Sequence, residues 1–211
     1  MISAVVLGAI SLRTATSFVV NWDLVISLSW NALFLIMAFL VLFAIFSAIR
    51  KKLLTQKELG LALPKWSEIG FGFLGVIVYF IASVLVMALA RQLLTFVNWD
   101  QSQDVGLPTM LFGVNLLIAF LFICVIVPIL EELIFRGLIF GRLRVKLGFI
   151  LSATITSVLF AALHGQWNVA IDVFVLSMVS CSAREITGNL NASIIMHMFK
   201  NMIAFYLLFV A

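Results

Sequence analysis

Charged side chains are scarce in this sequence, and their scarcity excludes most soluble folds. Only 10% of the 211 residues are charged and 64% are hydrophobic, whereas an average soluble domain carries roughly 25% charged residues. A membrane helix needs about 20 mostly apolar residues to cross a hydrocarbon core of roughly 30 Å. The length therefore admits six or seven membrane helices and no second, soluble domain, so we treat 1–211 as a single membrane domain.

Cysteine is also rare, and the basic residues are too dispersed for a nucleic-acid surface. Cys124 and Cys181 lie inside apolar stretches, which favours buried thiols over a disulfide or a metal pair. The net charge of +4 comes from short clusters beside apolar runs, which indicates membrane orientation and no nucleic-acid partner. No basic region precedes the first apolar stretch, so we expect the amino terminus to be retained.

Long uncharged stretches predict the helices. Three spans are expected at 24–49, 69–90 and 105–130, and the third should continue to about Arg144. Further helices are expected at 147–163, at 168–182 and from Leu190 onward, while 1–21 is either a seventh span or an interfacial helix. The predicted fold class is an all-α, polytopic membrane bundle of six to seven helices around a polar cavity. Its amino-terminal helices occupy 1–110, and 111–211 form a core that carries the polar motifs.

The distribution of charge between the predicted helices indicates a multi-pass protein. Basic residues at 50–57, at 142–146 and at Arg184 alternate with an acidic connection at 100–104, as the positive-inside rule requires. The compact chain favours a prokaryotic plasma membrane as its location.

Ionisable residues also occur inside the apolar segments, where each costs at least a few kcal/mol and usually marks function. They are Glu131, Glu132, Arg136, His164, Asp172, His197 and Lys200, with the polar Asn201 beside them. Glu131 and His164 are about equally far from the turn expected near 146–147, roughly 25 Å along each helix, so their side chains can meet.

Spacing along the helices suggests how the others are used. His197 and Asn201 are four residues apart and form one polar patch. Glu132 and Arg136 have the same spacing, which predicts an internal ion pair in preference to direct catalysis. Adjacent carboxylates point about 100° apart on a helix, so Glu131 and Glu132 should have different roles.

The residue types suit amide hydrolysis, which needs a base, an acid and donors for an oxyanion. Glu131 and His164 can provide the first two, and His197 and Asn201 the third. Two histidines and a glutamate could also bind zinc, but no HExxH motif is present, so we expect no metal and no cofactor.

The sequence leaves the roles of Asp172 and Lys200 open. Asp172 is expected to orient a histidine, to pair with Lys200 or simply to lie at the membrane edge. Lys200 is expected to reach Asp172, to receive a substrate carboxylate, or to extend to the interface.

Three motifs occur in order along the second half of the chain: EExxxR from Glu131, FxxxH ending at His164, and HxxxN from His197 to Asn201. Together they resemble the CAAX protease and bacteriocin-processing (CPBP, or Abi) family. The resemblance implies a helical membrane fold with a conical cavity. In that fold Glu131 and His164 activate water, and His197 and Asn201 form the oxyanion hole.

The resemblance also implies a peptide or protein substrate, either a prenylated carboxyl terminus, a peptide leader or a bacteriocin-related peptide, met within membrane lipid. We therefore interpret the sequence as an intramembrane endopeptidase. The rival interpretations are a non-hydrolytic receptor or scaffold that binds a peptide or lipid in the same cavity, and a transporter.

Overall fold

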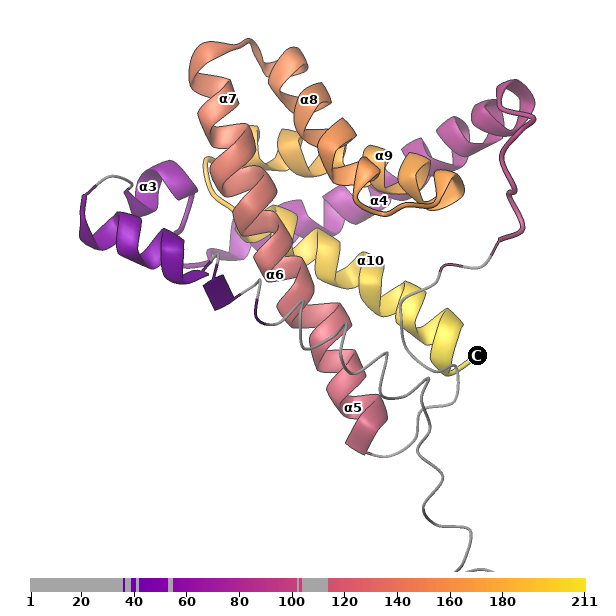
Figure 1. Ribbon diagram of the computed structural model, residues 1–211, viewed down its shortest axis with the longest axis horizontal. Coiled ribbons are helices and arrows are strands. Elements are labelled where there is room, and N and C mark those ends of the chain that lie inside the picture. The colour runs from indigo at the N-terminus through magenta and orange to yellow at the C-terminus, as the bar shows by residue number, and fades with distance from the viewer. Residues whose placement is uncertain (1–35, 37–38, 41, 53–54, 102, 104–113) are drawn as a thin grey trace, which may run out of the picture.

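In a computed structural model of the protein, the residues described are 36, 39–40, 42–52, 55–101, 103 and 114–211, and every regular element among them is a helix (Figure 1). The all-α prediction is thus confirmed for this part of the chain. Residues 1–21 and much of the expected span 24–49 lie outside it, although the described positions between 36 and 50 are helical.

A single long helix, residues 114–146, forms one side of the molecule and confirms the predicted continuation past Glu131. It consists of α5 (Val114–Leu121), the π-helical η1 (Phe122–Ile126), α6 (Val127–Glu132), the π-helical η2 (Leu133–Phe140) and α7 (Gly141–Lys146), which follow one another without a break. At about 1.5 Å per residue it is roughly 50 Å long, well beyond a 30 Å hydrocarbon core.

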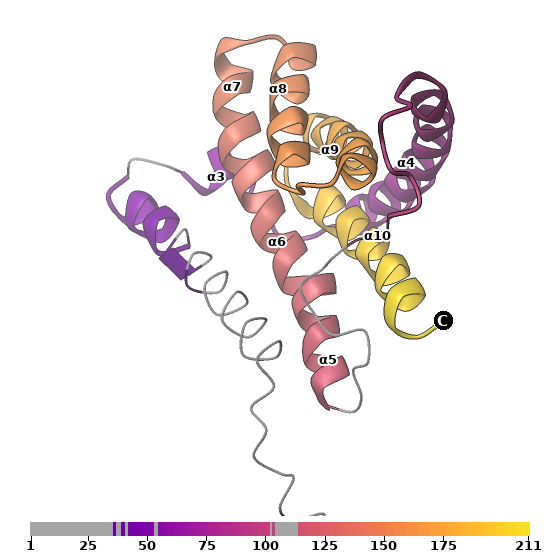
Figure 2. The ribbon, with the colours of Figure 1, turned by 45° about the vertical axis from the view of Figure 1, so that its right-hand side comes forward.

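The chain then turns back at Leu147 and Gly148 into α8 (Phe149–Ala162), so that α7 and α8 form the expected hairpin (Figure 2). A second turn leads into α9 (Trp167–Thr187), which runs five residues beyond the predicted end at Ser182. Charged residues suggested an earlier end, but Glu185 is held by Arg144 of α7 at 2.8 Å. The helix ends instead at Gly188, whose φ of 72° is left-handed.

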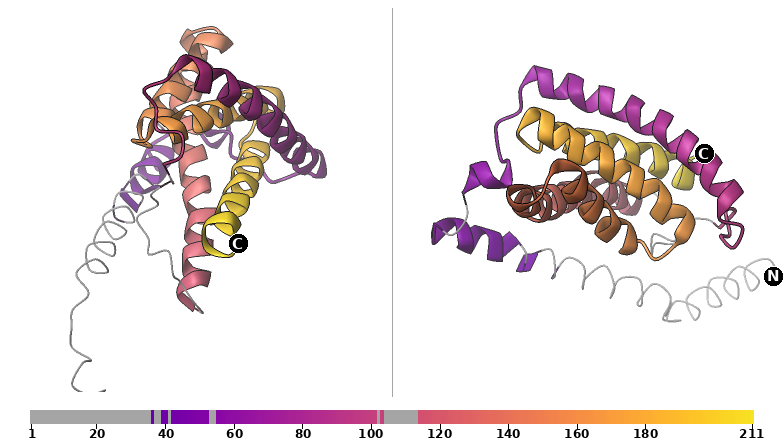
Figure 3. Two further views of the ribbon diagram at one scale, coloured as in Figure 1. Left: turned by 90° about the vertical axis from the view of Figure 1, so that its right-hand side faces the viewer. Right: turned by 90° about the horizontal axis from the view of Figure 1, so that it is seen from above.

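Two long helices lie together on the other side of the molecule. α4 (Trp66–Leu93) packs against both α9 and α10 (Asn191–Phe209), and α4 and α9 run side by side when viewed from above (Figure 3). The buried Glu68 at the start of α4 accepts hydrogen bonds from the side chains of Asn189 and Asn191. This polar contact fixes the point at which α10 begins relative to α4.

The short helix α3 (Gln56–Leu59) packs against the long helix where glycine permits close approach. A Cβ atom added at Gly137 would lie 3.1 Å from the Leu59 carbonyl oxygen, tighter than normal contact. Gly60 follows in a left-handed conformation, and its carbonyl accepts the backbone N–H of Leu190 at 2.9 Å. The α3 segment therefore bridges the long helix and the start of α10.

Three of the described helices are long and apolar enough to cross a membrane: Trp66–Leu93, Leu116–Lys146 and Asn191–Phe209. The expected fourth span, α8, has 14 residues and is therefore only about 21 Å long. α8 and α9 pack against each other and against the long helix. α8 carries Phe160 of the FxxxH motif, and His164 lies in the turn between α8 and α9.

Candidate active site

Glu132 and Arg136 form the ion pair that their spacing predicts. Arg136 Nη1 lies 2.9 Å from Glu132 Oε1, and both side chains are 0% exposed. The guanidinium also stacks over the ring of Phe160, with Cζ 4.6 Å from the centroid. Burial of a charged pair is tolerated only where each ion keeps its partner, so these two residues are part of the core of the bundle.

His197 lies between the two adjacent glutamates. Its Nδ1 is 3.0 Å from Glu132 Oε1, and its Nε2 is 3.5 Å from Glu131 Oε2. The carboxylate of Glu132 therefore orients the imidazole ring in addition to neutralising Arg136, a role that spacing along one helix did not indicate. Packing of α10 against α6 brings these residues together.

The neighbouring glutamates have opposite environments. The Glu132 side chain is 0% exposed, whereas the Glu131 side chain is 22% exposed. Among the described residues, the ionisable partner of Glu131 is His197, at the longer distance of 3.5 Å. Glu131 thus keeps oxygen atoms available to a solvent molecule or a substrate, as the 100° separation on the helix predicts.

His164 lies in the turn just after α8, and a carbonyl of that helix holds it in an orientation suited to accepting a proton. Its Nδ1 is 2.9 Å from the carbonyl oxygen of Phe160. Because a carbonyl can only accept, Nδ1 carries the hydrogen, and in the neutral ring Nε2 presents a lone pair. Glu131, His197 and Lys200 are close enough to interact electrostatically with His164.

The buried ring of Phe160 links the polar side chains, a role that the FxxxH motif did not indicate. Its centroid lies 5.0 Å from that of His164 and 5.9 Å from that of His197, both in edge-on geometry. With Arg136 on the same ring, one aromatic side chain contacts a residue of each motif. The four-residue step from Phe160 to His164 was the available signal, since it puts both on one helix face.

Asn201 is fixed by a backbone irregularity in the long helix. In η1 the N–H of Val127 bonds to Phe122 O, five residues back. The same step would pair Ile123 O with residue 128, but Pro128 has no N–H. The Asn201 amide nitrogen takes its place, 3.0 Å from Ile123 O. An amide nitrogen carries two hydrogens, so Asn201 has a second donor for a ligand.

A second polar cluster surrounds Asp172 on α9. Its carboxylate accepts hydrogen bonds from the hydroxyls of Tyr79, at 2.7 Å, and Ser83, both on α4. Lys200 Nζ lies 3.8 Å away, so of the arrangements considered for Lys200 the structure has the one facing Asp172. Tyr79 and Ser83 were missed because each is a single hydroxyl in an apolar run.

Within the described ranges, no group of three or more His, Cys, Asp or Glu side chains is placed to hold a metal ion. His197 directs Nδ1 to Glu132 and His164 directs Nδ1 to a backbone carbonyl, so these two contacts leave Nε2 of each ring unused. The reaction proposed below uses no metal.

Comparison with known proteins agrees with the motifs. A family model described as "Type II CAAX prenyl endopeptidase Rce1-like" matches residues 113–203, which include all eight residues singled out from the sequence. The chain is also similar to the membrane-embedded CAAX protease MroQ of Staphylococcus aureus (strain USA300), with 29% identity over 153 residues. Both comparisons therefore support the resemblance to the CAAX protease and bacteriocin-processing family.

The extent of this similarity differs between the two proteins. The match covers 70% of this chain but 61% of MroQ, so the chain spans less than two thirds of that relative's length. No solved structure matches significantly. With this similarity to a membrane-embedded protease and three apolar helices of spanning length in its described part, the chain is a multi-pass integral membrane protein.

Proposed function

We propose that this protein is a CPBP family member and an intramembrane endopeptidase in which Glu131 and His164 activate a water molecule. The observation that carries the proposal is the contrast between the two neighbouring carboxylates. Glu132 is buried and engaged with Arg136 and His197, whereas Glu131 is 22% exposed beside His197. An accessible carboxylate in an apolar region lowers the stability of the protein, and its presence is explained if it transfers protons in catalysis.

In the proposed reaction, Glu131 removes a proton from water while the water oxygen attacks the carbonyl carbon of the scissile peptide bond. The carbonyl oxygen becomes an oxyanion, which accepts hydrogen bonds from Asn201 and from His197 when its Nε2 is protonated. The proton then passes, through His164 or directly from Glu131, to the leaving nitrogen. The carbon–nitrogen bond breaks, which yields a carboxylic acid and an amine and returns the enzyme to its starting state.

Some of the polar side chains contribute to this reaction without touching the reacting atoms. Glu132 and Arg136 act as positioning residues, since Glu132 holds the ring of His197. Asp172 and Lys200 are proposed to form a charge pair at the edge of the site that opens to receive the carboxylate of a substrate. The proposed substrates are peptides with a prenylated carboxyl terminus, peptide leaders or bacteriocin-related peptides.

The test is cleavage of a peptide library by the purified full chain in lipid nanodiscs, with products identified by mass spectrometry. We expect Glu131→Gln and His164→Ala to abolish the cleavage that wild type gives. Asp100→Asn is the matched control, because this carboxylate is exposed in a loop, and it should cleave normally. Cleavage that persists in Glu131→Gln would overturn the assignment of the base.

Two further outcomes of the same experiment separate the rival functions. Peptide that binds to wild type without being cleaved would favour the receptor interpretation. Loss of cleavage on addition of a chelator, with recovery on addition of zinc, would contradict the metal-free reaction. We expect neither result.

A further inference from the structure

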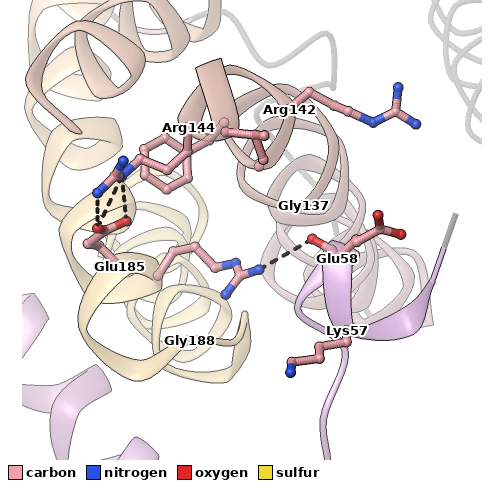
Figure 4. Close-up of a pocket in the computed structure, with 11 residues that line it drawn as sticks. Lys57, Glu58, Gly137, Arg142, Arg144, Glu185 and Gly188 are labelled. Atoms are coloured by element: carbon pink, nitrogen blue, oxygen red, sulfur yellow. Dashed lines mark hydrogen bonds and ion pairs between the residues drawn. The ribbon is translucent and has the colours of Figure 1, made fainter. Parts of the chain in front are cut away.

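A basic cavity lies at one end of the long helix, where none of the proposed catalytic residues lines it. The cavity has a volume of about 380 Å³ and is bounded by α3, by the end of η2 with α7, and by the end of α9 (Figure 4). Its walls carry four cationic side chains (Lys57, Arg142, Arg144 and Arg184) and two carboxylates (Glu58 and Glu185). The four positive and two negative charges leave a net charge of +2.

Both carboxylates are already engaged. Glu185 binds Arg144 through two of its guanidinium nitrogens, at 2.8 and 3.1 Å. Glu58 caps α3 by accepting the backbone N–H of Thr55 at 2.6 Å, and this hydrogen bond keeps the pKa of Glu58 below its usual range. In Figure 4, Arg144 turns toward Glu185 while Arg142 extends away from that pair.

Besides Arg142, which extends away from the Arg144–Glu185 pair, the cavity wall has two cations outside that pair, Lys57 and Arg184. In the described part of the chain, neither forms an ion pair with a carboxylate. Arg184 makes one long hydrogen bond, from Nη2 to the carbonyl oxygen of Glu58 at 3.4 Å. Its Nε is buried and has no hydrogen-bond partner among the described residues. A partly buried guanidinium with an unused donor is stabilised when an anion enters beside it.

The position of the cavity indicates which anion is available there. The apolar helix Leu116–Lys146 ends beside it, and the cluster of basic residues at that end (Arg142, Arg144 and Lys146) is typical of a helix end at the level of the lipid headgroups. Val145 lines the cavity and is 86% exposed, so an apolar surface adjoins the cationic one. A small soluble anion would contact only the cationic side chains. A phospholipid can contact both surfaces, because it carries a phosphate and an acyl chain in one molecule. Basic pockets between membrane helices bind anionic headgroups in this way.

We propose that this cavity binds the phosphate of an anionic membrane phospholipid, with Arg184 and Lys57 as its principal donors. The bound headgroup would hold α3 against the long helix that carries Glu131, because Gly137 and Gly141 of that helix form the opposite wall. The site is separate from the proposed hydrolysis and can be assayed on the Glu131→Gln variant.

Native mass spectrometry of the full chain tests the proposal, with phosphatidylglycerol and phosphatidylcholine of identical acyl chains offered in detergent. We expect wild type to prefer phosphatidylglycerol, and Lys57→Gln to reduce that preference roughly fivefold, as expected for loss of one interfacial cation. Lys57→Gln is the primary variant because its side chain makes no hydrogen bond to the described residues. Lys146→Gln is the matched control, since Lys146 is a nearby exposed cation outside the cavity, and it should keep the preference.

Two variants test Arg184, one that removes its charge and one that keeps it. Arg184→Gln should lose the preference, and Arg184→Lys should retain much of it while both keep the thermal stability of wild type. Equal losses in Lys57→Gln and Lys146→Gln would overturn the proposal, because they would indicate general surface charge. Displacement of phosphatidylglycerol by an equal concentration of glycerol 3-phosphate would also overturn it, since the site would then recognise free phosphate.

Discussion

Replacement of Glu132 by glutamine should destabilise the protein far more than replacement of its neighbour Glu131. Glu132 and Arg136 are both 0% exposed and lie 2.9 Å apart, so Glu132→Gln leaves a buried guanidinium uncompensated, at a cost of about 3–5 kcal/mol. Glu131 is 22% exposed and 3.5 Å from His197, a contact worth less than about 1 kcal/mol. The cost of about 3–5 kcal/mol for Glu132→Gln is a large share of a typical folding free energy of roughly 5–15 kcal/mol.

Unfolding of each variant by SDS in mixed micelles measures the difference, and peptide cleavage is assayed in parallel. Glu131→Gln should keep the unfolding midpoint of wild type and lose cleavage by about 10²–10⁴-fold, the usual contribution of a general base. Glu132→Gln should lower the unfolding midpoint and also lose cleavage. Similar midpoints for the two variants would refute the division of roles between the carboxylates.

A double variant separates folding from chemistry. Glu132→Gln combined with Arg136→Met removes both buried charges, and replacing a buried pair with apolar groups is often neutral for stability. We therefore expect the double variant to regain most of the stability lost in Glu132→Gln. Cleavage should remain low, because Nδ1 of His197 has lost the carboxylate that orients it. Recovery of cleavage would indicate that Glu132 serves only as a counterion.

Two other substitutions test contacts at the edges of the site. Pro128→Ala supplies a backbone N–H that can bond to Ile123 O and compete with Asn201; we expect slower cleavage with unchanged or higher stability, from steady-state rates and SDS unfolding. Lys200→Met removes the cation 3.8 Å from Asp172, and should abolish any preference for peptides with a free carboxyl terminus over their amidated forms. Equal cleavage of both peptide forms by wild type would contradict the proposed role of Lys200.

The helices and the internal ion pair could be predicted from the sequence because both depend on local patterns. Uncharged stretches determine where apolar helices run, and a four-residue step puts Glu132 and Arg136 on one helix face. The hairpin at 146–147 was also predictable, since it separates two apolar segments with a basic cluster. Distances along the two helices then placed Glu131 and His164 at similar depth.

Contacts between distant segments could not be predicted in the same way. The bond from Tyr79 to Asp172 joins residues 93 positions apart and depends on how α4 packs against α9. Likewise, the long helix has two π-helical segments, whose extra residue per turn changes which side chains share a face. The partner of Asn201 is a backbone carbonyl that one of these segments leaves without its usual N–H donor. No pattern of side chains in the sequence indicates this contact.

The environment of Glu131 also bears on the choice between an enzyme and a receptor. A receptor for an apolar or amphipathic peptide needs donors and shape, which the buried side chains and Asn201 can provide without a carboxylate in the cavity. Keeping Glu131 partly exposed at membrane depth costs stability, and its contact with His197 at 3.5 Å offsets little of that cost. The cost is understandable if the carboxylate takes a proton from water at the moment of attack, so Glu131→Gln should be neutral or stabilising for the fold while it removes the activity.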